Sequence, residues 1–282
     1  MKCLIVGGSG QFGISLIKIL KKKKYQIEVT TRSPSKTKLK FKKLNLKNLK
    51  ILKLDILNKK QVFAIIKKNF DYVFFFAGQS SPNLSFTKSK QTIESNYRGC
   101  KNFLEAIKET KSKTKFLNSS SSEIFSDTKK KLEIKSKKKP ISPYGKAKLL
   151  SFNITKKFRE NYNVKSYNAI FFNTESYFRE KNFLIPKICL AAINAQKFGK
   201  ITSFGNLNVV REWNWCDEQC NLLLKFISKK PQDFILSNGK PFSGYQMLEF
   251  AFEYFKLDFR NFIKIDSKHF RKRDFNYKLS NF

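Results

Sequence analysis

Short apolar runs alternate with longer segments of helical periodicity through the first two thirds of the chain. This alternation is typical of βαβ units, in which a helix follows each strand of a parallel sheet. Strands are predicted at Lys2–Val6, Gln26–Thr31, Lys50–Leu54, Tyr72–Phe76, Phe116–Ser119 and Ser166–Phe172. Helices are predicted at Ile14–Leu20, Lys60–Lys68, Ser89–Thr110 and Pro143–Tyr162. We therefore expect an α/β fold, a Rossmann-type doubly wound parallel sheet with helices on both faces.

The pattern changes to shorter elements after residue 172. Helices are predicted near Leu184–Gln196, Glu218–Ile227 and Tyr245–Phe255, and strands near Ile201–Phe204 and Phe234–Leu236. We interpret residues 1–172 as a dinucleotide-binding Rossmann domain. Residues 173–282 are interpreted as mostly a smaller α/β lobe that closes over a substrate.

The charge is strongly positive. The chain has 58 Lys+Arg against 21 Asp+Glu, a formal net charge of +37, but 41% of its residues are hydrophobic and 30 are Phe. That apolar content predicts a folded core and excludes a disordered polycation. The lysines are dispersed in short runs without a nucleic-acid-binding motif, so we expect a lysine-rich surface and no specific nucleic acid partner, in preference to a phosphate-backbone site. The electrostatic field of this positive charge would still steer an anionic substrate toward the protein.

Several features favour the cytoplasm. The longest apolar runs fall far short of the about 20 residues of a membrane-spanning helix, and glycines interrupt the apolar run near the N-terminus, unlike a signal peptide. The five cysteines are scattered and odd in number, which argues against a disulfide framework. Cys216 and Cys220 share a helix face, but with His269 as the single histidine we expect no metal site and no histidine-based catalysis.

A glycine triplet follows the first predicted strand and opens the first helix. In Gly7-x-x-Gly10-x-x-Gly13 the glycines allow a tight turn and let the backbone approach a pyrophosphate at the helix N-terminus. Taken alone, the triplet could be an ordinary strand-to-helix turn. Asp55 at the end of the third strand and Ala77 at the end of the fourth complete a dinucleotide-site pattern.

The end of the second strand bears on the choice of cofactor. An acidic residue at this place would accept hydrogen bonds from the ribose 2′-hydroxyl of NAD. This chain has Arg32 instead, which could pair with a 2′-phosphate, so we expect NADP.

A tyrosine and a lysine with a spacing of four residues are the candidate acid–base pair. Tyr144 and Lys148 share one helix face, and a nearby ammonium stabilises a phenolate, so we expect a lowered tyrosine pKa. In a lysine-rich chain the same spacing also fits a solvated helix face. Ser121 and Glu123, just after the fifth strand, are expected at the same carboxyl edge of the sheet, where open α/β sheets bind ligands.

Together these motifs resemble an extended short-chain dehydrogenase/reductase, and within that superfamily the GDP-mannose 4,6-dehydratase family. The motifs that carry the resemblance are Gln79-Ser80 with Ser85-Phe86, Asn96-x-x-Gly99, Ser120-Ser121-Ser122-Glu123, Ser142-Pro143-Tyr144-x-x-x-Lys148, Phe172-Asn173-x-Glu175-Ser176, Arg211-x-Trp213 and Pro231-x-Asp233-Phe234. The chain departs from the family at Ser121, where Thr is usual, and at Phe12, where an acidic residue is usual.

The resemblance implies a redox-neutral dehydration of a GDP-sugar, most simply GDP-mannose. Tyr144, assisted by Lys148 and Ser121, would remove the C4 hydroxyl proton while hydride passes to NADP⁺. Glu123 would take the C5 proton, water would leave from C6, and the returning hydride would give a 4-keto-6-deoxy sugar. Two alternatives stay open: a GDP-sugar reductase or epimerase, which needs no Glu123, and a fold relative without turnover.

The resemblance also assigns residues to each part of the site. The cofactor residues are Gly7, Gly10, Gln11, Phe12, Gly13, Arg32, Asp55, Ile56, Ala77, Gly78, Gln79, Tyr144 and Lys148. The substrate residues are Ser80, Ser85, Ser122, Asn173, Arg179, Lys187 and Arg211. The basic ones among them could instead belong to the solvated lysine-rich surface. The family further implies a homodimer or homotetramer.

Overall fold

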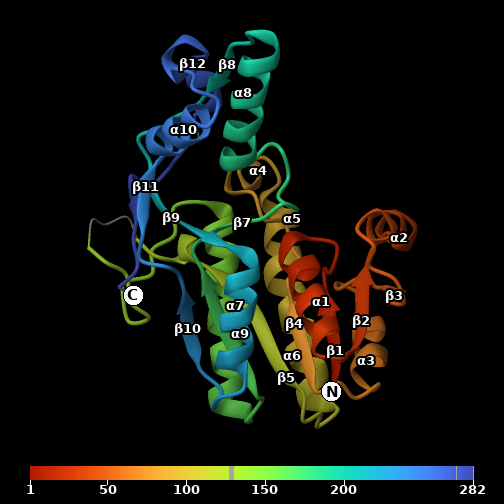
Figure 1. Ribbon diagram of the computed structural model, residues 1–282. Coiled ribbons are helices and arrows are strands. Elements are labelled where there is room, and N and C mark those ends of the chain that lie inside the picture. Colours follow the sequence, from red (N-terminus) through yellow and green to blue (C-terminus); the bar gives the residue numbers. More distant parts are fainter. Residues whose placement is uncertain (127–129, 271, 282) are drawn as a thin grey trace.

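Buried strands in parallel register form the centre of the molecule. The computed structural model describes residues 1–126, 130–270 and 272–281. Within these residues, seven strands form one parallel sheet in the order β10-β6-β5-β4-β1-β2-β3. The strands are β1 (Lys2–Val6), β2 (Gln26–Thr31), β3 (Lys50–Lys53), β4 (Tyr72–Phe75), β5 (Lys115–Ser121), β6 (Ser166–Phe171) and β10 (Asp233–Leu236). The predicted doubly wound sheet is confirmed (Figure 1).

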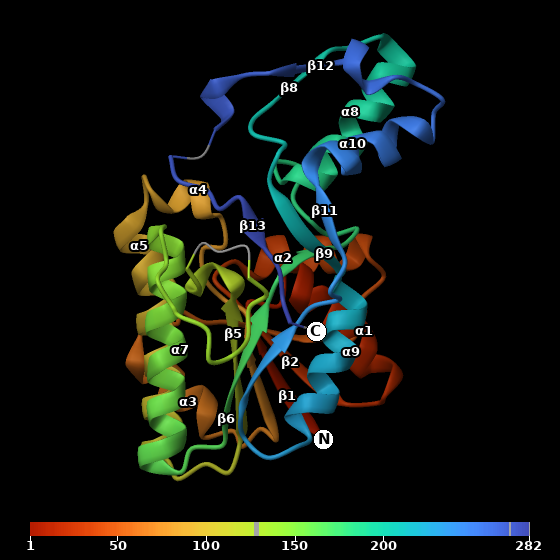
Figure 2. The same ribbon diagram turned by 90° about the vertical axis from the view of Figure 1, so that its left-hand side faces the viewer.

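Helices cover both faces of this sheet (Figure 2). The helices of this part are α1 (Gln11–Lys22), α2 (Pro34–Lys43), α3 (Lys59–Ile66), α4 (Pro82–Ser85), α5 (Ser89–Ile93), α6 (Gly99–Glu109), α7 (Pro143–Tyr162) and α9 (Cys216–Ile227). A π-helical turn, η1 (Glu94–Arg98), joins α5 to α6. Apolar side chains of α1 and α9 pack on one face, and those of α3 and α6 pack on the other. None of the helices in the described part of the chain is long and apolar enough to cross a bilayer.

The upper lobe follows residue 172. Its elements are β7 (Asn173–Glu175), α8 (Leu184–Phe198), β8 (Thr202–Phe204), β9 (Val210–Trp215), β11 (Pro241–Ser243), α10 (Gly244–Glu253), β12 (Ile263–Ile265) and β13 (Tyr277–Lys278). Of these elements, α8, α10, β8 and β12 lie at the top of Figure 1. Their own apolar cluster joins α8 to α10. Two elements that follow residue 172 join the central core instead, because β10 pairs with β6 and α9 packs on α1.

Helix α2 is absent from the sequence prediction. Its buried residues are only Thr37 and Phe41, and lysines occupy most other positions, so the apolar periodicity is weak. The sequence feature that indicates the start of this helix is Ser33 followed by Pro34 at the first helical position.

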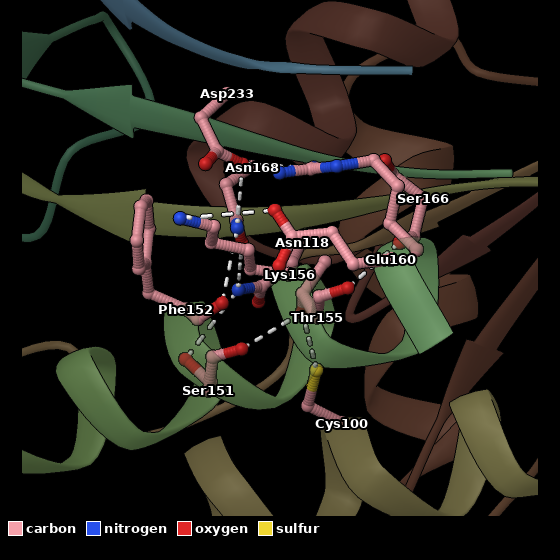
Figure 3. A network of polar contacts seen from close by, with 11 residues as sticks. Cys100, Asn118, Ser151, Phe152, Thr155, Lys156, Glu160, Ser166, Asn168 and Asp233 are labelled. Atoms are coloured by element: carbon pink, nitrogen blue, oxygen red, sulfur yellow. Dashed lines mark hydrogen bonds and ion pairs between the residues drawn. The ribbon is translucent and has the colours of Figure 1, made fainter. Parts of the chain in front are cut away.

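A buried polar network fixes helix α7 to the sheet (Figure 3). The amide of Asn118 on β5 donates to Asn168 Oδ1 on β6 at 2.9 Å, and Asn168 Nδ2 donates to Asp233 Oδ1 on β10 at 2.9 Å. Asp233 also pairs with Arg159 of α7 at 2.9 Å, and Asn168 Nδ2 donates to the carbonyl of Phe152 on the same helix at 3.1 Å. Buried polar groups that all find partners hold elements in one register. The middle and last turns of α7 are thereby held against β5, β6 and β10.

Candidate active site

The carboxyl ends of the central strands border one large cavity of about 880 Å³. Parallel register makes this convergence possible: Val6 at the end of β1 lies between Thr30 of β2 and Phe75 of β4. Of the predicted site residues, the cavity is lined by Gly7, Gly10, Gln11, Phe12, Gly13, Arg32, Asp55, Ile56, Ala77, Gly78, Gln79, Ser80, Ser121, Ser122, Glu123, Tyr144, Lys148, Asn173, Arg179 and Arg211. Ser85 and Lys187 do not line it.

The glycine loop leaves no room for side chains. Gly7 has φ +83°, and a Cβ there would lie 2.8 Å from the backbone of Ala77. A Cβ at Gly13 would lie 2.4 Å from Gly8. Gly10 precedes α1 without supplying a capping side chain, so the N-terminus of that helix opens on the cavity. This is the cradle that a pyrophosphate needs.

Two residues inside the glycine loop form part of the cavity wall. Gln11 Nε2 donates to the carbonyl of Thr174 at 3.0 Å, and its Oε1 accepts from Ser176 Oγ at 3.0 Å. The Phe12 ring lies 4.3 Å from the ring centre of Phe171. Gln11 therefore ties the glycine loop to the start of the upper lobe, and Phe12 packs on the last residue of β6.

The far end of the cavity is basic. Arg32 is exposed there, and Lys36 and Lys40 of α2 also line this region. Asp55 Oδ1 accepts from the backbone of Leu57 at 3.0 Å, which orders the turn after β3. The two lysines were missed by sequence reasoning because α2 was missed.

Asn96 lies in the π-helical turn η1, and its contacts explain the Asn96-x-x-Gly99 motif. Its Nδ2 donates to the carbonyl of Gln79 at 3.0 Å, and a Cβ at Gly78 would lie 2.5 Å from its Oδ1. A Cβ at Gly99 would lie 2.6 Å from Ile56. The motif therefore shapes the loops after β3 and β4 where they line the cavity.

Tyr144 and Lys148 lie on the first turns of α7 and are 8% and 6% exposed. The Lys148 ammonium donates to the Ser119 carbonyl at 2.7 Å and lies 5.8 Å from the centre of the Tyr144 ring. Burial lowers the pKa of Lys148 to about 8. Burial raises the pKa of Tyr144 to about 12, partly opposed by a hydrogen bond with Ser121. The lowered tyrosine pKa expected from sequence is therefore wrong for this structure, because desolvation of the phenolate outweighs nearby positive charge.

Glu123 lies on a single 3₁₀ turn, η2 (Ser122–Ile124), directly after β5. Its backbone N–H donates to Ser121 Oγ at 3.3 Å. A Cβ at Gly145 would lie 2.5 Å from the Glu123 carbonyl, so this turn packs tightly on the start of α7. The Glu123 carboxylate is close enough to Tyr144 to raise its pKa. The structure thus brings Ser121, Glu123 and Tyr144 together in the cavity.

Glu175 and Arg179 form a buried ion pair in the cavity wall. Glu175 Oε2 lies 3.7 Å from Arg179 Nε, and neither atom has a hydrogen-bond partner among the described residues. Burial raises the pKa of Glu175 to about 7, opposed by Arg179. The guanidinium also opposes the rise in the pKa of Tyr144. Sequence reasoning assigned Glu175 to the ordering of its loop, and the spacing of four residues from Arg179 is the signal that could have indicated the pair.

The other predicted substrate residues differ in their surroundings. Asn173 lines the cavity at the start of β7. Arg211 also lines it, but its guanidinium donates to Asp274 Oδ1 at 2.9 Å and to the Phe275 carbonyl at 2.7 Å. The Lys187 ammonium lies 4.9 Å from the centre of the Phe204 ring. The described residues contain no group of three or more His, Cys, Asp or Glu that could hold a metal ion.

The sheet order, the glycine loop and the Tyr-x-x-x-Lys pair at the carboxyl edge define a protein of the short-chain dehydrogenase/reductase class. Among solved structures, the UDP-glucose 4-epimerase of Thermus thermophilus in complex with NAD superposes with a TM-score of 0.86 at 16% identity. The match covers 100% of this chain and 90% of that one. At this identity the likeness shows a shared fold.

The family follows from sequence. The family model for GDP-mannose 4,6 dehydratase matches residues 4–280, and the chain belongs to this family. It is 28% identical over 208 residues to GDP-mannose 4,6 dehydratase 2 of Arabidopsis thaliana, covering 71% of this chain and 56% of the relative. It is 29% identical over 267 residues to the human (Homo sapiens) GDP-mannose 4,6 dehydratase, a match that covers 88% of this chain and 71% of the relative. The matched stretch is little more than half the length of the Arabidopsis protein.

Proposed function

We propose that the protein is a nucleotide-sugar 4,6-dehydratase, a hydro-lyase that converts GDP-mannose to its 4-keto-6-deoxy derivative with NADP. The observation that carries the proposal is the presence of a carboxylate, Glu123, beside the Ser121, Tyr144 and Lys148 group in one cavity. Oxidation at C4 needs one base, and elimination across C5 and C6 needs a second. A reductase or epimerase of the same class would need no Glu123.

The cavity fits a dinucleotide. Gly7 and Gly13 leave space that a Cβ would fill, and the N-terminus of α1 opens on it, as a pyrophosphate requires. We assign the adenosine end to the region of Arg32, Lys36 and Asp55. The positive charge of Arg32 and Lys36 supports a 2′-phosphate, and hence NADP in preference to NAD. When bound, the oxidised nicotinamide nucleotide supplies a positive charge and accepts the hydride that it later returns.

The chain's own residues then move protons. Tyr144 accepts the proton of the C4 hydroxyl as that carbon becomes a ketone, and Ser121, its hydrogen-bond partner, holds the phenol in place. The ketone acidifies C5, and Glu123 takes the C5 proton. The bond from C6 to its hydroxyl breaks, and that hydroxyl leaves as water with the proton that Glu123 took from C5. A solvent proton then adds to C5 as C6 receives hydride, and Tyr144 releases the C4 proton to solvent, so that one water is lost and no net oxidation occurs.

The substrate is held on the side of the upper lobe. We assign Arg179 and Asn173 to the sugar nucleotide because both line the cavity, and the Arg179 guanidinium is close enough to Tyr144 to act on its pKa. Ser80 and Ser122 line it too and remain candidates. Arg211 is 3% exposed and donates to Asp274 and Phe275, so we propose that it braces the wall.

We further propose that the enzyme acts in the cytoplasm as a homodimer or homotetramer. All five cysteines are free, and four of them are buried, which fits a reducing compartment. Light scattering coupled to size-exclusion chromatography measures the assembly directly. A monomer at working concentration would contradict this part of the proposal.

The test of function is incubation with GDP-mannose and NADP⁺, followed by detection of the alkali-induced absorbance of a 4-keto sugar. We expect product without net formation of NADPH, and none from the Tyr144→Phe variant. UDP-glucose and dTDP-glucose serve as matched substrates with other bases. Product from either at the GDP-mannose rate would contradict the base assignment, and absence of any 4-keto product would contradict the dehydratase.

A further inference from the structure

The segment from Asp274 to Ser280, which we call the C-terminal strap, contacts the turn that carries Glu123. Its strand β13 lies parallel to β9 (Figure 2), with Lys278 opposite Arg211. The carbonyl of Leu279 accepts from the backbone of Leu132 at 2.8 Å. The strap therefore joins the β9 sheet to the segment that follows η2.

Lys278 makes the contact with the turn itself. It is 1% exposed, and its ammonium donates to the carbonyl of Ser122 at 3.1 Å and to the carbonyl of Phe125 at 3.2 Å. These two carbonyls lie one residue before and two residues after Glu123. The same ammonium lies 3.4 Å from the centre of the Phe275 ring.

These contacts restrain the turn from the strap side. Hydrogen bonds from a buried ammonium are stronger than neutral ones, and a buried ammonium that lost them would be costly. On the other side, Ser121 Oγ accepts from the Glu123 N–H, and Gly145 packs against the Glu123 carbonyl. The backbone of Glu123 is thus held between the start of α7 and Lys278.

The strap is itself fixed near Lys278 by Glu212. This buried carboxylate accepts from both the backbone and the hydroxyl of Ser280, and from the hydroxyl of Ser237 on the other side. Arg211, the preceding residue, donates to Asp274 and Phe275. A lysine anchored at its backbone in this way can fix the position of the groups to which its side chain donates.

We propose that Lys278 is a positioning residue for Glu123, which holds the η2 turn so that this carboxylate meets the C5 proton. The proposal rests on the proposed function, since Glu123 is the C5 base only in a dehydratase. Lys278 touches neither substrate nor cofactor in this account. It acts by setting the backbone of η2, and the first half-reaction, which depends on Tyr144 and Lys148, does not need it.

The test compares Lys278→Met with Lys115→Met and Lys278→Arg. Lys115 is the control, because its ammonium also donates to a carbonyl, that of Ile227 at 3.0 Å, and lies 5.8 Å from the centre of an aromatic ring, that of Tyr72, outside the cavity lining. In Lys278→Met we expect faster amide hydrogen exchange at residues 122–126, and kcat for dehydration lower by roughly 10- to 100-fold with KM nearly unchanged. Transient NADP⁺ reduction by the sugar should keep its wild-type rate. Lys278→Arg should restore most of the loss, and Lys115→Met should show neither effect.

Unchanged amide exchange in the η2 turn of Lys278→Met would overturn the proposal. Equal losses in NADP⁺ reduction and in dehydration would also overturn it, since that result indicates a general structural role. If Lys278→Met does not fold, Lys278→Gln, which keeps one amide donor, should give an intermediate exchange rate. A wild-type protein without dehydration would contradict the proposed function alone, because the amide-exchange comparison still decides whether Lys278 holds the turn.

Discussion

The ammonium of Lys148 donates a hydrogen bond to the carbonyl oxygen of Ser119 across 2.7 Å, at a buried position on the first turns of α7. The contact fixes the side chain 5.8 Å from the centre of the Tyr144 ring. Among the described residues, only Ser119 accepts hydrogen bonds from this ammonium, and these two bonds replace the hydration that the charged form had in the unfolded chain. The site therefore holds a charge that burial disfavours, and stability and chemistry are opposed at this residue.

Lys148→Met should stabilise the fold at neutral pH. The folded pKa of about 8 lies below the ordinary 10.5, so stability from this group is present above about pH 10.5 and is lost as pH falls through 8. Removing the buried charge should raise the free energy of unfolding near pH 7 by at most about 3 kcal/mol. Loss of the hydrogen bonds to Ser119 should offset about 1 kcal/mol of this gain. Thermal unfolding of the variant, with the exposed Lys146→Met as control, checks this. A variant less stable than wild type near neutral pH would contradict it.

Glu175 should make stability fall as pH rises. Its folded pKa of about 7 lies above the ordinary 4.5, so its stabilising contribution is complete below about pH 4.5 and is lost as pH rises through 7. Glu175→Gln should remove this pH dependence, an effect of at most about 3 kcal/mol. Urea unfolding at acidic and alkaline pH measures it, with the exposed Glu180→Gln as control. The same pH slope in Glu175→Gln and wild type would exclude this role for the pair with Arg179.

Arg32 should set the cofactor preference. Arg32→Glu removes a charged partner of the 2′-phosphate and adds repulsion, so NADP affinity should fall by roughly 10- to 100-fold while NAD affinity changes little. Calorimetric titration with both nucleotides measures this, and Lys38→Glu, on the neighbouring helix α2 but outside the cavity lining, is the charge-matched control. Equal losses for the two nucleotides, or NAD bound more tightly by wild type, would contradict the assignment.

Local signals predicted the central fold well. Strands Lys2–Val6 and Gln26–Thr31 and helix Pro143–Tyr162 have the predicted bounds. Lys2–Val6 is apolar from Cys3 onward, as a buried parallel strand often is, and the helix starts at a Ser-Pro pair whose serine caps it. The cofactor loop could also be predicted from local sequence, because the conformation and close packing of its backbone require glycine.

Long-range pairings were not predictable from local patterns. Lys278 is 156 residues from Ser122, and in a chain with 58 Lys+Arg no single lysine stands out. Strands β7, β11 and β13 have only two or three residues each, and each pairs with β9, far away along the chain. The pKa of Tyr144 depends mainly on burial, and burial cannot be predicted from the spacing between Tyr144 and Lys148.

The central claim is that Glu123 is the base for C5. In deuterated water, wild-type protein with GDP-mannose should incorporate deuterium at C5 of a 4-keto-6-deoxy product. Glu123→Gln should bind both nucleotides and still reduce NADP⁺, but should lose C5 exchange and product by roughly 10² to 10⁴. Tyr144→Phe should block the first hydride transfer, and Glu180→Gln, another carboxylate of the cavity lining, should leave the rates near wild type. C5 exchange and product formation at the wild-type rate in Glu123→Gln would contradict the account.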